Sequence, residues 1–350
     1  MKIRYEKFGM TKNNEEVINY TIEAQNIKVE ILNYGCTIKS IYTPDRNGNL
    51  ENIVLGFKKL EDYEKENTPY LGCIVGRIAG RTKEGLLKIG DKKYQLSKNN
   101  GNNNLHGGNN GLHRKVWESY AVLADNKAVL TFKTTSPHME EGFPGTVEFT
   151  IKYTIDENSI TIEYLGIPDR ETYMNLTNHA YFNLSGNVKT DILQQEIRLN
   201  ATGYYSVDKE TLPLELVKED EIFSSHKSIC LGKILEINNK QIEIAGGGYD
   251  HPFLLSKQEK IDGYAIDRNS GRKLEFMTDQ PVAVFYTGNY LAESTDYPKH
   301  GGFCLETQDY PDIVNLCPEN MKIYSPKNIY TQKTTYVFSV EWNTKSIFST

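Results

Sequence analysis

The chain has 350 residues, of which 38% are hydrophobic and 25% are charged, and its formal net charge at pH 7 is -6. This composition suits a globular protein with a substantial core and excludes a disordered or collagen-like chain. The acidic balance, without any block of basic residues, argues against a nucleic-acid or anionic-membrane partner. No signal-peptide pattern follows the charged N-terminal residues, and no segment reaches the roughly 18 apolar residues of a membrane span. We therefore expect a cytoplasmic protein.

Alternation of apolar and polar residues dominates the chain. The clearest strand covers residues 147–155, and the turn residues 156–158 lead into a second strand from residue 160, which predicts a hairpin. The same alternation predicts further strands at residues 27–34, 128–135, 273–278, 282–286 and 336–342. Helical periodicity is weak, and residues 60–66 are the best candidate for a short helix. No linker or internal repeat divides the chain. The sequence thus predicts an all-β protein, a large antiparallel β-sandwich, with residues 1–350 forming a single domain.

The five cysteines form no CxxC pair, and their odd number argues against a disulfide framework. We expect buried, reduced thiols. Cys304 lies among other functional candidates, but we interpret it as a packing residue, because a reactive thiol needs a basic and partly exposed setting.

Polar and glycine-rich residues gather in five segments that are far apart in the chain, at residues 76–81, 104–108, 175–184, 246–251 and 301–312. The segment around His179 also holds three asparagines, a threonine and a tyrosine. It is too polar for a buried strand unless these groups meet one another or a ligand. In the last segment Glu306 alternates with apolar neighbours, as expected for a carboxylate that points from a strand into a cleft. The run 99–111, rich in Asn and Gly, predicts an ordered loop.

Several chemistries lack support. No GxGxxG or GxxxxGK[ST] motif indicates a nucleotide cofactor, and no GxSxG motif indicates a serine hydrolase. Imidazole and carboxylate groups suit zinc or manganese, and the candidate ligands are His106, His179, Asp250, His251 and Glu306. No two histidines have the short sequence spacing of a metal site. We therefore expect neither a metal nor another cofactor. The many hydrogen-bonding side chains in these segments suit a sugar, because its hydroxyl groups need such partners. A His and a Glu among them add one group that can give a proton and one that can take a proton.

These motifs, in this order, resemble the aldose 1-epimerase (galactose mutarotase) family. The resemblance covers nearly the whole chain and rests on Asn33-Tyr34-Gly35, Leu105-His106-Gly107-Gly108, residues 175–184, Gly247-Gly248-Tyr249-Asp250-His251, Tyr286-Thr287-Gly288-Asn289 and Leu305-Glu306-Thr307-Gln308. It implies a large β-sandwich and a reaction that interconverts the α and β anomers of a free aldose without a cofactor.

The resemblance also assigns roles. Glu306 is implied to be the general base that removes the C1 hydroxyl proton, and His179 the general acid that protonates the ring oxygen. The ring then opens, the C1–C2 bond rotates, and closure reverses both roles. The implied substrate-binding residues, with Arg81 preferred over Arg77, are Arg81, His106, Asp250 and Gln280, and the further candidates are Asn178 and Tyr181.

One departure from the family puts a contact in doubt. Many members carry Asn directly before the binding arginine, where this chain has Gly80. We interpret His251 as a residue that packs against or orients Asp250.

Three alternatives stay open. A hexose-phosphate epimerase would need extra basic residues near the cleft to pair with a phosphate. A glycoside hydrolase or polysaccharide lyase could use Asp250 and Glu306 as two carboxylates. A carbohydrate-binding module would need no acid–base pair. The sequence leaves the preferred aldose and the oligomeric state open.

Overall fold

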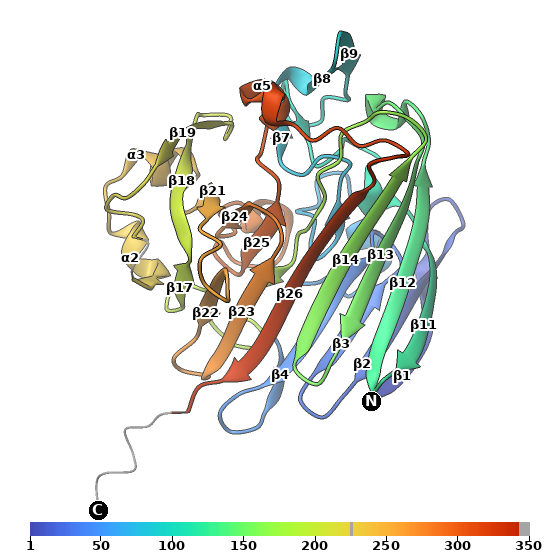
Figure 1. Ribbon diagram of the computed structural model, residues 1–350. Helices are drawn as coiled ribbons and strands as arrows, with labels where there is room; N and C mark the ends of the chain where they lie inside the picture. The colour runs from blue at the N-terminus through green and yellow to red at the C-terminus, as the bar shows by residue number, and fades with distance from the viewer. Residues whose placement is uncertain (225–226, 343–350) are drawn as a thin grey trace, which may run out of the picture.

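The computed structural model describes residues 1–224 and 227–342, and antiparallel strands dominate it (Figure 1). Within these residues, a five-stranded sheet contains, in spatial order, β1 (Lys2–Met10), β2 (Glu16–Glu23), β3 (Lys28–Leu32), β4 (Thr37–Pro44) and β5 (Leu50–Asn52). A nine-stranded sheet has the order β11 (Glu118–Ala124), β12 (Lys127–Ser136), β13 (Val147–Ile155), β14 (Ser159–Pro168), β26 (Tyr330–Val340), β23 (Arg272–Thr278), β22 (Gly263–Ile266), β17 (Glu196–Leu199) and β20 (Ile229–Cys230).

A six-stranded sheet carries several residues of the cavity described below. Its order is β16 (Tyr181–Phe182), β25 (Phe303–Gln308), β24 (Val282–Tyr286), β21 (Asp250–Leu255), β18 (Ala201–Val207) and β19 (Pro213–Val217). In Figure 1 the labelled strands of this sheet lie to the left of β26 and above β23. Its strands come from distant parts of the chain, so their side chains meet only after folding.

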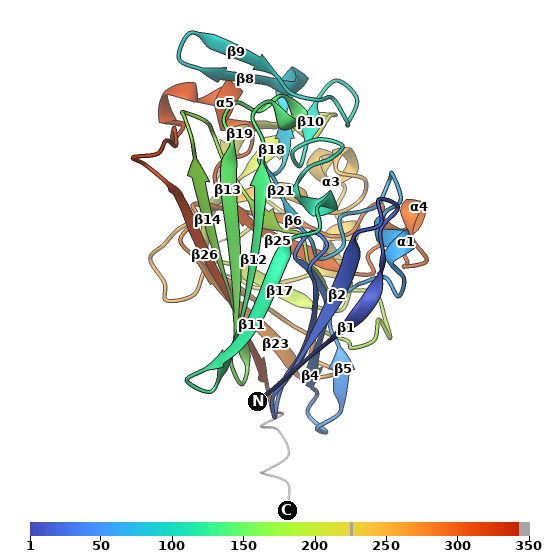
Figure 2. The ribbon, with the colours of Figure 1, turned by 90° about the vertical axis from the view of Figure 1, so that its right-hand side faces the viewer.

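Short elements connect the sheets. Three strand pairs are β6 (Ile74–Val75) with β15 (Thr177–Asn178), β7 (Arg81–Thr82) with β10 (Asn104–Leu105), and the hairpin β8 (Leu86–Ile89) with β9 (Lys92–Gln95), which projects from one end of the molecule (Figure 2). The helices are short: α1 (Leu60–Tyr63), α2 (Leu231–Leu235), α3 (Lys240–Ile244), α4 (Leu291–Ser294) and α5 (Ile313–Leu316), with 3-10 turns at Lys83–Gly85, Leu112–Arg114, Glu140–Gly142 and Pro318–Asn320.

The alternation in the sequence corresponds to real strands. In β13 every second side chain is buried, from Val147 to Ile155, and the strand forms the predicted hairpin with β14. The other predicted strands are also confirmed, with β24 at its predicted bounds and β26 beginning six positions earlier than expected. The predicted helix at 60–66 is α1, which ends at Tyr63. The all-β sandwich is therefore confirmed.

Apolar side chains from all three larger sheets pack into one buried cluster. It includes Ile31 of β3, Ile151 of β13 and Phe285 of β24, each at most 1% exposed. This continuity supports the single domain, which stays a prediction. Among the described residues, no helix is both long and apolar enough to cross a membrane.

Candidate active site

A cavity of about 430 Å³ opens beside the six-stranded sheet, between its strands and the loops that surround β7 and β10. It is lined by six of the residues proposed from the sequence: Arg81, His106, His179, Tyr181, Asp250 and Glu306. Its wall also contains Tyr70, Val284 and Tyr286. The fold thus gathers most of the candidate residues in one place.

Glu306 lies in β25, which has β16 on one side and β24 on the other. It is 4% exposed and lies opposite Val284 of β24. Burial raises the pKa of its carboxyl group to about 8, and the nearby Asp250 charge adds to this rise while Arg81 opposes it. A carboxyl group with this pKa can exchange a proton near neutral pH.

His179 lies between β15 and β16, and its backbone is fixed on both sides. Its N–H donates to the carbonyl oxygen of Cys73 at 2.9 Å, and its own carbonyl accepts from the N–H of Gly72 at 3.0 Å. The ring of Tyr181 lies 5.0 Å from the imidazole, centroid to centroid, and the ring of Tyr70 lies 5.8 Å from it. Burial lowers the pKa of His179 to about 4. This packing fixes the direction in which the imidazole points.

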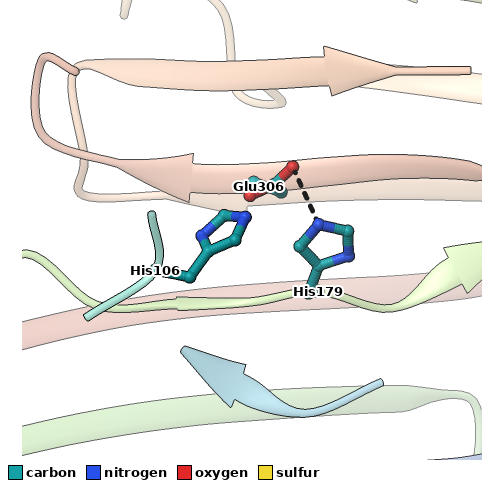
Figure 3. Close-up of side chains that lie close together, drawn as sticks. All are labelled: His106, His179 and Glu306. Carbon is teal, nitrogen blue, oxygen red and sulfur yellow. Dashed lines mark ion pairs between the residues drawn. The ribbon is translucent and has the colours of Figure 1, made fainter. Parts of the chain in front are cut away.

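The imidazole of His179 points at the carboxylate of Glu306. The distance from Nε2 to Oε1 is 3.5 Å, and Figure 3 shows the two groups facing each other beside His106. The roles implied by the resemblance require an ionised Glu306 and a protonated His179. In the ligand-free site the pKa values shift the other way, because burial disfavours both charged forms. Between about pH 4 and about pH 8 the pair therefore carries one proton.

His106 is fixed by two hydrogen bonds with Gly80. The N–H of His106 donates to the Gly80 carbonyl at 3.1 Å, and the N–H of Gly80 donates to Nδ1 of His106 at 3.2 Å. Burial, together with the charges of His179 and Arg81, lowers the pKa of His106 well below its usual value. A neutral imidazole whose Nδ1 accepts carries its proton on Nε2. His106 therefore presents an N–H donor.

Arg81 and Asp250 face each other across the cavity wall, with Nη1 and Oδ2 3.7 Å apart. Nε of Arg81 donates to Oδ1 of Asn100 at 3.1 Å. The backbone N–H of Asp250 donates to Nδ1 of His251 at 3.1 Å, which agrees with an orienting role for His251. Burial raises the pKa of Asp250, and Arg81 opposes that rise. The cavity thus offers a cation and an acceptor side by side.

Arg77 lies away from the cavity and is 2% exposed. Its guanidinium donates to Oγ and to the carbonyl oxygen of Ser136, and to the carbonyls of Pro137 and Pro144, at 2.7 to 3.0 Å. Of the two arginines in this segment, Arg81 is therefore the one that reaches the cavity.

Two expected binding residues are not brought to the cavity wall. Gln280 lies in the turn before β24, where its side-chain amide donates to Asp279, and Val284 is the β24 residue that lies opposite Glu306 and lines the cavity. The structure therefore does not support Gln280 as a sugar-binding residue. Asn178 is buried behind the wall, where its amide donates to the Gly72 carbonyl and accepts from the N–H of Ala180. These contacts fix the backbone on both sides of His179.

Three residues of this site were not among the expected site residues. Tyr70 contacts the rings of His106 and His179, and Tyr286 contacts that of His179, at centroid distances of 4.7, 5.8 and 6.5 Å. A tyrosine-rich chain gives no local signal for such contacts. Asn100 was part of the Asn-rich loop, and its function as a partner of Arg81 is visible only in the fold.

Among the described residues, one group could approach a metal ion. The ligand atoms of His106, His179 and Glu306 lie within 4.8 Å of one another. Ligand atoms around tetrahedral zinc lie only about 3.3 Å apart, given metal–nitrogen bonds of about 2.0 Å. The groups would have to move inward to bind zinc, and the absence of a metal stays a prediction.

The fold and the cavity define a β-sandwich protein with a buried proton donor–acceptor pair among hydrogen-bonding groups suited to a small polyol. The sequence profile described as Aldose 1-epimerase matches residues 19–337, and the chain belongs to the aldose 1-epimerase family.

Individual relatives agree with this membership. Galactose mutarotase from Bos taurus is 36% identical over 334 residues, which cover 93% of this chain and 94% of that protein. Aldose 1-epimerase from Haemophilus influenzae is 32% identical over 305 residues, covering 84% of this chain and 87% of that protein. The crystal structure of galactose 1-epimerase from Lactobacillus acidophilus NCFM has a TM-score of 0.86 at 26% identity, covering 97% of this chain and 99% of that chain.

Proposed function

We propose that this chain is an aldose 1-epimerase that interconverts the α and β anomers of free hexoses such as glucose and galactose. The observation that carries the proposal is the approach of His179 Nε2 to Glu306 Oε1, 3.5 Å apart, in a cavity lined by polar groups. The galactose mutarotase and aldose 1-epimerase relatives support the same reaction.

In the proposed mechanism, a proton moves from Glu306 to His179 when the closed sugar binds, so that ring opening begins with Glu306 ionised and His179 protonated. Glu306 takes the C1 hydroxyl proton, His179 gives its Nε2 proton to the ring oxygen, and the bond between C1 and the ring oxygen breaks as the aldehyde forms. The C1–C2 bond rotates. The hydroxyl then attacks the other face of C1, returning its proton to Nε2, while Glu306 returns its proton to the aldehyde oxygen. The pair holds one proton throughout.

The pKa values support this cycle. Burial favours neutral His179 beside protonated Glu306, which is the state that accompanies the open-chain sugar. Because burial disfavours the charged pair, ring opening returns Glu306 and His179 to their more stable protonation states. The donors Arg81 and His106 and the acceptor Asp250 would bind the sugar hydroxyls.

A phosphorylated sugar is less well accommodated. Among the described residues that line the cavity, Arg81 is the only permanent cation, and Asp250 already faces it. A phosphate dianion would need further basic partners. We therefore propose a free aldose as the substrate. A cytoplasmic location is part of the proposal, and five unpaired cysteines, three of them buried, support it.

Polarimetry of freshly dissolved α-glucose and α-galactose tests the proposal. Glu306→Gln and His179→Asn should each reduce kcat by about 10²- to 10⁴-fold, the usual contribution of a general acid or base. Gln280→Ala serves as the matched control and should keep the wild-type rate. Wild-type rates in either of the first two variants would refute the proposed pair. A parallel assay with glucose 6-phosphate should show little acceleration.

A further inference from the structure

Both ring nitrogens of His179 face side chains of the same strand. Nε2 lies 3.5 Å from Oε1 of Glu306, and Nδ1 lies 3.5 Å from Sγ of Cys304. Cys304 and Glu306 are two positions apart in β25, so they point to the same face of the sheet. The imidazole thus spans the space between a thiol and a carboxylate.

Proton accounting identifies the tautomer that the proposed reaction needs. A protonated imidazole that gives up its Nε2 proton is left with a proton on Nδ1 and a lone pair on Nε2. That lone pair must take the proton back when the sugar ring closes. If the neutral ring instead carried its proton on Nε2, it could not accept one there. Nδ1 of His179 must therefore stay protonated and needs an acceptor.

Cys304 is placed to be that acceptor. The backbone carbonyl of His179 also interacts with the imidazole, but this oxygen accepts from the N–H of Gly72 at 3.0 Å as well, and the hydroxyl of Tyr181 donates to the carbonyl of Pro69 at 3.0 Å. Cys304 is fully buried, and burial raises the pKa of its thiol well above the usual value, with Glu306 and Asp250 adding to the rise. The sulfur therefore stays neutral and cannot remove the Nδ1 proton, although it can accept a weak hydrogen bond.

We propose that Cys304 is a positioning residue whose sulfur accepts the Nδ1–H of His179, so that the ring keeps a proton on Nδ1 and exchanges protons only through Nε2. The proton exchange that Cys304 would support belongs to the proposed function, so this inference rests on that function. The tautomer of His179 can nevertheless be measured without it. The positioning role replaces the interpretation of Cys304 as a residue that only packs. A neutral acceptor has a further effect: unlike a carboxylate, it does not stabilise the charged ring, so His179 remains a ready proton donor.

The tautomer can be measured without any activity. Two-bond ¹⁵N–¹H correlation spectra of the full chain with ¹⁵N-labelled histidine distinguish Nδ1–H from Nε2–H, and the His179→Asn spectrum assigns the signals. At pH 6 we expect Nδ1–H in the wild type and in Cys304→Ser, whose hydroxyl also accepts. In Cys304→Val, which keeps a similar volume without an acceptor, the Nε2–H signal should grow.

The kinetics should follow the tautomer. We expect kcat of Cys304→Val to fall about tenfold, as for the loss of one modest hydrogen bond, with KM within twofold of the wild type and kcat largely kept in Cys304→Ser. An Nε2–H tautomer in the wild type would overturn the inference, even if Cys304→Val failed to fold. So would a Cys304→Val protein whose kcat falls while its tautomer is unchanged, because that result indicates packing alone. Failure of the proposed function would instead appear as full activity in Glu306→Gln.

Discussion

Because Glu306 and His179 share one proton, the proposed enzyme should have a flat pH optimum with two defined limits. Above about pH 8 the pair loses its proton and has no acid, and below about pH 4 both groups are protonated and there is no base. Each pH unit beyond a limit should lower kcat/KM of the ligand-free enzyme tenfold. The alkaline limit depends on Asp250, whose charge raises the pKa of Glu306. Asp250→Asn should therefore move that limit to lower pH.

Polarimetric rates between pH 4 and pH 10, corrected for the uncatalysed rate in each buffer, measure this shift. Loss of a substrate contact in Asp250→Asn changes the height of the profile, whereas the altered charge changes the position of its limit. Glu293→Gln is the matched control, because Glu293 also lines the cavity but is not among the causes of the Glu306 shift. An alkaline limit that stays in place in Asp250→Asn, or moves to higher pH, would refute the electrostatic reasoning.

Substitutions at three other positions test the cavity wall and the packing that supports it. Gly80→Asn should raise the free energy of unfolding by about 1 kcal/mol, because the buried, unpaired amide of Gln308 lies beside this position and gains a partner. Gly80→Ala should instead lower the free energy of unfolding by about 1 kcal/mol, because φ is +73° at this position. Urea unfolding measures both changes. Asn100→Ala should raise KM several-fold in the anomerisation assay without changing stability greatly, because Arg81 loses its Nε acceptor. Arg77→Met should cost about 2–4 kcal/mol in urea unfolding, because it leaves buried carbonyls unpaired.

The fold was predictable where the buried face of a strand is apolar. In β13 the alternation gives the bounds directly. In β26 the prediction began six positions late, because the buried face there carries Gln332 and Thr334. These groups are satisfied inside the protein: Gln332 donates to the Thr307 carbonyl, and Thr334 shares a hydrogen bond with the Thr307 hydroxyl. A strand with polar residues at its buried positions has the sequence pattern of a solvent-exposed strand, because the sequence does not show the hydrogen-bond partners of those residues.

The site was predictable where a residue type and its neighbours are unusual, as for His179 and Glu306. Gln280 shows the limit of position-by-position transfer, because one turn and the register of β24 decide which side chain reaches the cavity, and Val284 lies opposite Glu306 instead. The protonation state could not be predicted either. It depends on how completely the pair is buried, which the sequence does not report. Tyr70 escaped notice for a related reason, since its contacts with the histidine rings exist only in three dimensions.

The pairing of β16 with β25, in which Tyr181 lies opposite Cys304, also constrains how the protein folds. His179 and Cys304 are 125 residues apart in the chain, so their contact closes a long loop. Contacts of this kind form slowly, because the entropy of loop closure is lost before they stabilise the chain. We expect strand hairpins such as β13–β14 to form early during refolding and this pairing to form late. Recovered catalysis would then report the last stage of folding, after spectroscopic signals of the sheets have returned.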